Sequence, residues 1–163
     1  MNLSYRLVSG LVLLASIVGM AFALYLEHFK GLQPCPLCVF QRVGLMAMGL
    51  FAFIGLVHNP KNTIVKRIYA GLASLGILWS TGVAARHVWI QHLPPSEVPS
   101  CGPGLNYLVD VLPLKEVLSQ VLTGSGECAK IDWTFLGQSM PVWSLVFFSF
   151  LLLVCLWQVF RKY

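Results

Sequence analysis

Four long runs of apolar residues alternate with more polar segments along the chain. A helix rises about 1.5 Å per residue, so about 20 apolar residues cross a hydrocarbon core about 30 Å thick. The runs that reach this length are residues 7–26, 39–57, 68–90 and 142–160. The pattern therefore predicts an all-α membrane protein, a bundle of four transmembrane helices in a single domain spanning residues 1–163.

The segments between the runs differ in length. Residues 27–38 and 58–67 are short, whereas residues 91–141 form a long loop rich in Pro and Gly. Within this loop, apolar residues recur at helical spacing from Leu114 to Leu122, with Pro113 expected at the first helical position. We therefore expect one short amphipathic helix in the loop. The pattern leaves open whether that helix lies flat on the membrane surface or packs onto the bundle.

The composition agrees with a membrane protein. Of the 163 residues, 57% are apolar and 10% are charged, against roughly 25% charged in an average soluble domain. The mean hydropathy is +0.76 and the formal net charge is +5. In a polar chain such a basic excess would suggest nucleic-acid binding, but in a chain this apolar it indicates orientation in the membrane. We therefore expect a lipid bilayer, and no nucleic acid, among the partners.

The basic residues outside the apolar runs are unevenly distributed. Six of them lie in the three segments 1–6, 58–67 and 161–163. Only three are spread over the longer loops 27–38 and 91–141. Because Lys and Arg favour the cytoplasmic side, both termini are expected in the cytoplasm, and the loops 27–38 and 91–141 are expected on the outer side.

The first apolar run has an alternative interpretation as a cleaved signal peptide. Ala21-Phe22-Ala23 would then be the cleavage site. The run is longer than the usual 7 to 15 residues of a signal peptide, which favours a helix that is retained.

Four of the five cysteines lie in the outer loops. Cys35 and Cys38 form a Cys-Pro-Leu-Cys motif just ahead of the second run, and Cys101 and Cys128 lie 27 residues apart in the long loop. Cys155 lies about 14 residues into the fourth run and so some 20 Å from the outer surface, too far for a disulfide to the others. We expect Cys155 to be a small buried apolar side chain.

Cysteines in such loops can form a metal site, inert disulfides or a redox-active pair. No metal site is expected, because a zinc ribbon needs two closely spaced pairs and this chain has one. Two inert disulfides would suit an oxidising compartment, and a bond between Cys101 and Cys128 would stabilise the fold by roughly 3 kcal/mol. A Cys-x-x-Cys disulfide closes a very small loop and stabilises little, which is typical of pairs that open and close during redox catalysis.

The surroundings of Cys35 and Cys38 favour the redox interpretation. The pair lies where the second helix begins, so the helix dipole and unpaired amide groups favour a thiolate there. Arg42 follows Cys38 by four residues and lies one turn along the same face. His87 lies at the same depth on the third run, about 5 Å below the outer boundary. A cation and an imidazole at this depth would suit a carbonyl-bearing, lipid-soluble oxidant.

These polar residues also have simpler interpretations. Arg42 would otherwise extend to the lipid headgroups, and His87 would otherwise bond to a backbone carbonyl. Arg86 is interpreted as an interfacial anchor, with any further role left open.

The order of these motifs resembles the bacterial disulfide bond formation protein B (DsbB) family of quinone-dependent thiol oxidases. The resemblance covers nearly the whole chain and is far more specific than Cys-x-x-Cys alone. It rests on Cys35-Pro-Leu-Cys38 with Gln41-Arg42, Arg86-His87 with Gln91, Cys101 and Cys128 in the long loop, and Met140-Pro141 at the start of the fourth run.

The resemblance implies an enzyme of the bacterial inner membrane whose cysteine loops face the periplasm. It would reoxidise a periplasmic thioredoxin-like disulfide oxidase of the DsbA type. This partner would attack a disulfide between Cys101 and Cys128 and form a mixed disulfide at Cys101. Electrons would then pass to Cys35 and Cys38, and from them to the membrane quinone pool.

The resemblance also implies a quinone site, for either ubiquinone or menaquinone. Cys38 would be the thiolate that contacts the quinone. Arg42 would stabilise both that thiolate and the reduced quinone oxygen, and His87 and Gln91 would help to hold the ring.

Two alternatives remain at this point. A vitamin K epoxide reductase-like quinone enzyme also has four helices, a Cys-x-x-Cys and outer-loop cysteines, but there the Cys-x-x-Cys follows the loop pair, whereas here it comes first. A structural membrane protein with two inert disulfides is the alternative outside the oxidoreductases.

Overall fold

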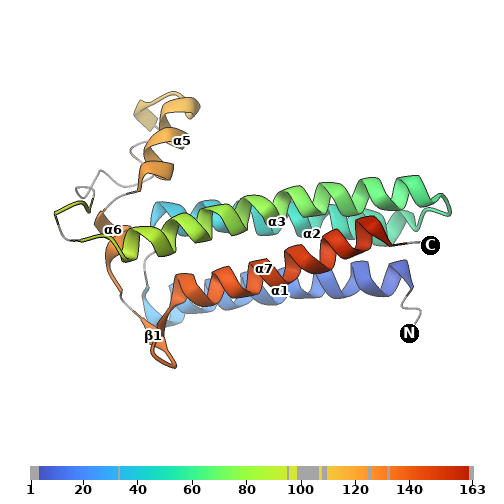
Figure 1. Cartoon of the computed structure of the whole chain (residues 1–163), viewed down its shortest axis with the longest axis horizontal. Helices are drawn as coiled ribbons and strands as arrows, with labels where there is room; N and C mark the ends of the chain where they lie inside the picture. Colours follow the sequence, from blue (N-terminus) through green and yellow to red (C-terminus); the bar gives the residue numbers. More distant parts are fainter. Residues whose placement is uncertain are drawn as a thin grey trace.

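Four long helices form the body of the protein in a computed structural model (Figure 1). The model describes residues 4–32, 34–94, 96–98, 107, 110–124, 126–131 and 133–161. The four helices are α1 (Tyr5–Lys30), α2 (Pro36–His58), α3 (Thr63–Gln91) and α7 (Met140–Phe160). All four are long and apolar enough to cross a membrane, and each of the four expected spans lies within one of them. The expected all-α bundle is therefore confirmed.

The helix ends follow from local sequence signals. The Ser4 side chain accepts a hydrogen bond from the Leu7 amide and caps the start of α1. Gly31 ends α1 in the left-handed conformation, with φ +66°. Helix α2 starts at Pro36, whose missing amide hydrogen costs nothing at a first helical position. It ends at Asn59, which also adopts a positive φ.

The segment between α3 and α7 holds several short elements. The expected loop helix is present as α5 (Leu114–Thr123), but Pro113 precedes it as the N-cap in an extended conformation and is not its first helical residue. A single turn, α6 (Gly126–Ala129), follows. Two short strands, β1 (Thr134–Phe135) and β2 (Gln138–Ser139), then pair antiparallel. Neither α6 nor this hairpin was predicted from the sequence.

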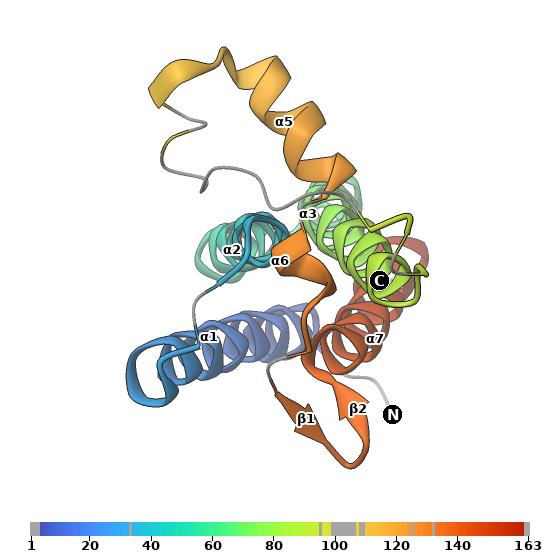
Figure 2. The ribbon, with the colours of Figure 1, turned by 90° about the vertical axis from the view of Figure 1, so that its left-hand side faces the viewer.

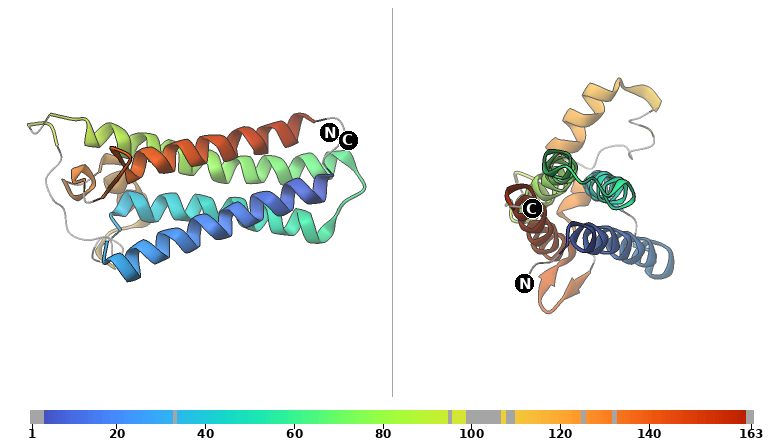
Figure 3. Two further views of the ribbon diagram at one scale, coloured as in Figure 1. Left: turned by 90° about the horizontal axis from the view of Figure 1, so that it is seen from below. Right: turned by 90° about the vertical axis from the view of Figure 1, so that its right-hand side faces the viewer.

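The short elements all lie at one end of the bundle. Helix α1 starts and helix α7 ends at the opposite end (Figures 1 and 3). Viewed along the bundle, α1, α2, α3 and α7 follow one another around it, and α6 lies in front of the middle of the bundle (Figure 2). Helix α1 packs extensively on α2, α2 on α3 and α3 on α7, whereas α1 and α7 meet over a much smaller area.

Helices α2 and α3 approach each other most closely at two glycines. A Cβ atom at Gly44 would lie 2.5 Å from the backbone oxygen of Gly76, and one at Gly76 would lie 2.8 Å from the backbone nitrogen of Met48. Small residues at such crossings let membrane helices pack backbone against backbone. One turn further out, the Ser80 hydroxyl donates to the Gln41 carbonyl at 2.7 Å. These contacts fix the register of α2 against α3.

The middle of the bundle is an apolar core. Cys155 is 1% exposed and belongs to this core, as expected of a small apolar side chain. The other members come from all four long helices, among them Val12, Met48, Ile77 and Leu151. The core lies between the two ends of the bundle. At one end α1 starts and α7 ends, and this end is expected to face the cytoplasm; the other end carries the Cys35–Cys38 motif.

The close approach of α2 and α3 makes Gly44 intolerant of any side chain. In Gly44→Ala, the new methyl group would meet backbone atoms of α3 that cannot move aside, so we expect a loss of about 1–3 kcal/mol of stability. The measurement is the apparent midpoint of thermal unfolding in detergent. Gly71→Ala on α3 is the matched control, because no atom lies within 4 Å of its added Cβ. Equal midpoints for the two variants would contradict this account of the packing.

Candidate active site

The Cys-Pro-Leu-Cys motif forms the first turn of α2. Cys35 is the N-cap residue in an extended conformation, Pro36 begins the helix, and Cys38 lies within its first turn. The two Sγ atoms are 3.4 Å apart as thiols. A disulfide needs about 2.05 Å between sulfurs, so a small side-chain movement closes the bond. The start of the helix supplies a partial positive charge that favours a thiolate at this place.

His87 lies directly against both thiols. Its Nε2 atom is 3.8 Å from Cys35 Sγ, and its Nδ1 atom is 3.9 Å from Cys38 Sγ. The side chain is 4% exposed. Nε2 is also 3.1 Å from the backbone oxygen of Cys128. A carbonyl only accepts, so Nε2 carries the hydrogen and Nδ1 of the neutral ring faces Cys38 as an acceptor.

The loop cysteine Cys128 reaches the same place from α6. It is 1% exposed, and its backbone oxygen accepts the hydrogen bond from His87. The structure therefore brings three of the four expected redox cysteines to one end of the bundle. The fourth, Cys101, lies outside the described residues.

A cavity of about 730 Å³ opens beside the thiols. Cys35 and Cys38 line it together with the three expected binding residues Arg42, His87 and Gln91. Most of the remaining wall is apolar and comes from α1, α2 and α7, including Phe22, Leu45 and Phe147. The cavity is not confined to α2 and α3, which carry the expected binding residues, but extends to α1 and α7. Volume and lining are typical of a site for an apolar ligand with a few polar groups.

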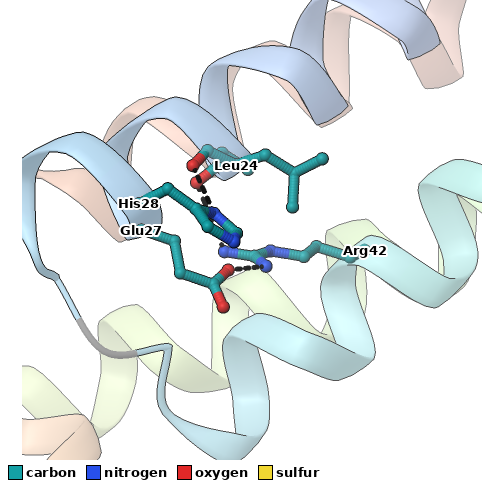
Figure 4. Close-up of polar contacts among 5 residues, drawn as sticks. Leu24, Glu27, His28 and Arg42 are labelled. Atoms are coloured by element: carbon teal, nitrogen blue, oxygen red, sulfur yellow. Dashed lines mark hydrogen bonds and ion pairs between the residues drawn. The ribbon is translucent and has the colours of Figure 1, made fainter.

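Arg42 pairs with a carboxylate that the sequence analysis did not single out. Its Nη1 atom donates to Oε2 of Glu27 on α1 at 2.5 Å, and Nη2 lies 3.5 Å from the Ala23 carbonyl (Figure 4). The two side chains are 20% and 28% exposed. The arginine therefore bridges α2 to α1 at the cavity wall, with its charge balanced there. A charged group inside the membrane boundary normally has such a partner, and this was the signal that could have identified Glu27.

Two glutamines complete the polar part of the site. The Gln41 amide nitrogen lies 3.4 Å from His87 Nδ1, in a role that the motif Gln41-Arg42 alone did not indicate. Gln91 is the last residue of α3, and its Oε1 accepts a hydrogen bond from Ser139 at 2.6 Å. Ser139 is the N-cap of α7, and Met140 and Pro141 begin that helix as expected. Gln91 thus joins the outer ends of α3 and α7 at the cavity.

Arg86 holds the loop helix in place. Its Nε and Nη2 atoms donate to the carbonyl oxygens of Leu122 and Thr123, at 3.1 and 3.2 Å. These carbonyls lie in the last turn of α5, where a cation satisfies unpaired acceptors and the helix dipole. The expectation of a simple interfacial anchor is therefore replaced by a defined contact between α3 and α5.

Apolar packing docks the same segment. Val117 and Val121 of α5 are buried in a cluster with Leu37, Ile90 and Cys128. Gly124 follows α5 with φ +89°, and a Cβ atom there would lie 2.3 Å from Ile90 Cδ1. Of the two placements that the sequence left open, packing onto the bundle is the one observed. Helix α5 nevertheless runs across the bundle axis and extends beyond α2 and α3 (Figures 1 and 2).

Four membrane-length helices that hold paired thiols beside an imidazole at one end define a membrane-embedded thiol–disulfide oxidoreductase. The model of the disulfide bond formation protein DsbB family matches residues 5–158, and the chain belongs to that family. This membership decides against the vitamin K epoxide reductase-like alternative. The protein is therefore a disulfide-forming oxidoreductase with four membrane-length helices.

Several curated proteins are similar over the whole chain. Disulfide bond formation protein B of Acinetobacter baumannii is 74% identical over 163 residues, which cover 100% of this chain and 95% of that protein. The protein of the same name from Acinetobacter baylyi is 73% identical over 163 residues, which again cover 100% of this chain and 95% of that protein. The one from a Psychrobacter species is 52% identical over 164 residues, covering 98% of this chain and 96% of that protein.

The Arg86 contact predicts how firmly the Cys128 segment is held. In Arg86→Gln the charged hydrogen bonds to α5 weaken, so we expect Cys128 of the reduced protein to be alkylated about tenfold faster, equivalent to about 1.4 kcal/mol. The measurement is maleimide labelling resolved by peptide mass spectrometry. Arg67→Gln is the matched control, because Arg67 lies on the same helix and contacts the Arg161 carbonyl at the other end. An unchanged Cys128 rate in Arg86→Gln would exclude the holding role.

Proposed function

We propose that this protein reoxidises a periplasmic thioredoxin-like disulfide oxidase of the DsbA type and passes the electrons to a membrane quinone. One observation carries the proposal: the thiols of Cys35 and Cys38 lie 3.4 Å apart in the wall of an apolar cavity, with His87 and the Cys128 segment directly above them. A dithiol in such a position can exchange with a loop disulfide on one side and with a lipid-soluble oxidant on the other.

The loop half-reaction transfers a disulfide. The reduced partner attacks the Cys101–Cys128 disulfide, forms a mixed disulfide at Cys101 and leaves oxidised. The resulting loop dithiol then reduces the disulfide of Cys35 and Cys38 through thiolate attack. The position of Cys128 supports this second exchange, because Cys128 lies against His87 and beside the Cys35–Cys38 pair.

The membrane half-reaction restores the Cys35–Cys38 disulfide. A quinone, when bound, accepts two electrons and two protons from the two thiols and leaves as a quinol. Nδ1 of His87 faces Cys38 as an acceptor and can take its proton. Arg42 lies at the cavity wall, paired with Glu27, and its guanidinium has further N–H groups that can donate to a thiolate or to negative charge that develops on the ligand oxygen.

The residues present fit a quinone. The cavity is largely apolar, as an isoprenoid ligand requires, and Arg42 and Gln91 in its wall can donate hydrogen bonds to ring oxygens. His87 can donate as well once its Nδ1 has taken a proton. The smaller contact between α1 and α7 lies on the side where the cavity extends, and it supports entry of the ligand from the lipid.

The relay also requires a defined orientation in the bacterial inner membrane. Both termini would lie in the cytoplasm and the cysteine loops in the periplasm, where the partner oxidase is found. The basic residues of segments 1–6, 58–67 and 161–163 favour this orientation. The described ends of the chain lie opposite α5 and α6, as an even number of spans requires (Figure 1).

The direct test is a reconstituted reaction. Purified protein is mixed with a soluble quinone and a reduced thioredoxin-like oxidase of the DsbA type, and the quinone absorbance is followed. With the protein oxidised at the start, we expect quinone to be reduced only when the partner and this protein are both present, with one partner disulfide formed per quinol. Quinone reduction that does not depend on the partner, or partner oxidation that does not consume quinone, would contradict the proposal.

Four of the five cysteines should be essential for oxidation of the partner, and the fifth should not contribute to it. Replacing Cys35, Cys38, Cys101 or Cys128 singly by Ser should abolish steady-state oxidation of the partner, since each takes part in an exchange. Cys155→Ser is the control, because this residue lies in the apolar core and should leave the rate nearly unchanged. If Cys128→Ser still turned over at the normal rate, the loop pair would instead be an inert disulfide.

Arg42 should determine how tightly the protein binds quinone. Arg42→Met should raise the Michaelis constant for quinone about ten- to hundredfold, the effect of one charged hydrogen bond worth about 1.5–3 kcal/mol. Arg42→Lys should recover part of the affinity, because lysine keeps the charge and lacks the planar fork. The double variant Glu27→Gln/Arg42→Met is the control for a carboxylate left without its partner. Normal quinone kinetics in the double variant would remove Arg42 from the site.

The orientation has its own test. A reporter fused after Tyr163 or inserted within residues 58–67 should behave as cytoplasmic, and one inserted within residues 91–141 should behave as periplasmic. A periplasmic C-terminus would place every loop cysteine on the wrong side for the relay.

A further inference from the structure

Three donors that are far apart in the sequence converge at the start of α2. The Sγ atoms of Cys35 and Cys38 and a ring nitrogen of His87 all lie within 4.8 Å of one another. Cysteine spacing alone predicted no metal site, because the third donor comes from α3 and only the tertiary structure brings it in. Thiolate and imidazole donors are the set that Zn²⁺ and related soft divalent ions prefer.

The separations suit a tetrahedral ion. Bond lengths of about 2.3 Å to sulfur and about 2.0 Å to nitrogen place two donors of one tetrahedral ion roughly 3.5–3.8 Å apart. Here the two sulfurs are 3.4 Å apart, and Cys38 Sγ is 3.9 Å from His87 Nδ1. Adjustments of a few tenths of an ångström would bring these two pairs into that range, and a side-chain rotation of Cys35, whose Sγ now lies 3.8 Å from Nε2, would complete the geometry.

His87 is already oriented as a metal ligand. Histidines that bind metals usually donate their other ring hydrogen to a carbonyl or carboxylate, which fixes the tautomer. His87 Nε2 has this partner in the backbone oxygen of Cys128, at 3.1 Å. Nδ1, which carries no hydrogen, faces Cys38 as an acceptor. Its present neighbour is the Gln41 amide at a long 3.4 Å, a contact that an ion would displace at little cost.

The charges favour a divalent ion over a monovalent one. Two thiolates and a neutral imidazole carry a charge of −2, so a divalent ion makes the cluster neutral, whereas Cu⁺ leaves it negative. Neutrality matters here, because His87 is 4% exposed and charge is costly near the membrane boundary. The Arg42 charge does not alter the sum, since Glu27 balances it.

We propose that the reduced protein binds one Zn²⁺-like ion through Cys35, Cys38 and His87. Binding exchanges the two thiol protons for the ion, and no electron moves. All three residues line the cavity, so water there can supply the fourth ligand and the ion can leave through it. A disulfide offers no thiolate, so the ion competes with reoxidation and acts as a reversible inhibitor. The inference concerns metal binding alone and needs neither quinone nor partner.

The test uses Cd²⁺ as a spectroscopic substitute for Zn²⁺. Full-length protein in detergent is reduced, freed of reductant and quinone without oxygen, and titrated with Cd²⁺. We expect ultraviolet sulfur-to-metal charge-transfer absorption that saturates at one equivalent and is reversed by a chelator. Oxidised protein should not give the signal. A signal of equal strength in oxidised protein, or none in reduced protein, would overturn the proposal.

Variants assign the ligands. Cys35→Ser and Cys38→Ser should abolish tight binding, and His87→Gln should weaken it about tenfold or more. Cys155→Ser and the double variant Cys101→Ser/Cys128→Ser should bind as the unaltered protein does. Zn²⁺ should also slow alkylation of Cys38 in the unaltered protein, a readout that does not depend on any variant folding. Unchanged affinity in His87→Gln, or loss of binding in the loop double variant, would contradict this ligand set.

Discussion

The close approach of α2 and α3 at Gly44 and Gly76 is the constraint on which the site depends. Neither position has room for a Cβ atom, so the two helices meet backbone to backbone and cannot slide past each other. The Ser80 hydroxyl bonded to the Gln41 carbonyl extends this register toward the outer end. Cys38 lies about two turns beyond Gly44, and His87 about three turns beyond Gly76. Backbone packing deep in the bundle therefore places an imidazole against a pair of thiols.

The outer end of α3 also holds the Cys128 segment in place. Within little more than one turn, Arg86 holds the end of α5, His87 holds the Cys128 carbonyl and Ile90 fits against Gly124. Together they bury Cys128 over the Cys35–Cys38 pair. The side chain of Cys128 is 1% exposed in this position, so a soluble partner would reach the proposed loop disulfide through Cys101 unless this segment undocks. Few residues hold it, so the cost of undocking is concentrated in contacts that single substitutions can change.

The sequence was sufficient to predict the long elements and to indicate that Cys35, Cys38, Arg42 and His87 lie together. The four apolar runs predicted α1, α2, α3 and α7, because a span of fixed length is a strong constraint on composition. The spacing of Cys35 and Cys38, and the depth of Arg42 and His87, indicated one site because helix geometry fixes both. Helix α5 was predicted from its periodicity, but its docking was not, since Arg86 and Gly124 act through contacts between segments distant in sequence. The Glu27 partner and the β1–β2 hairpin were missed for related reasons: one is a tertiary ion pair, and the other turns at Leu136 with a positive φ unusual for leucine.

The most direct test isolates the Cys35–Cys38 pair from the loop. The Cys101→Ser/Cys128→Ser variant is fully reduced and mixed, without oxygen, with one equivalent of a soluble quinone, and the disulfide and the quinol are then counted by mass spectrometry and absorbance. The account predicts one Cys35–Cys38 disulfide for every quinol formed. Quinone that stays oxidised while both thiols stay reduced in the folded variant would contradict it.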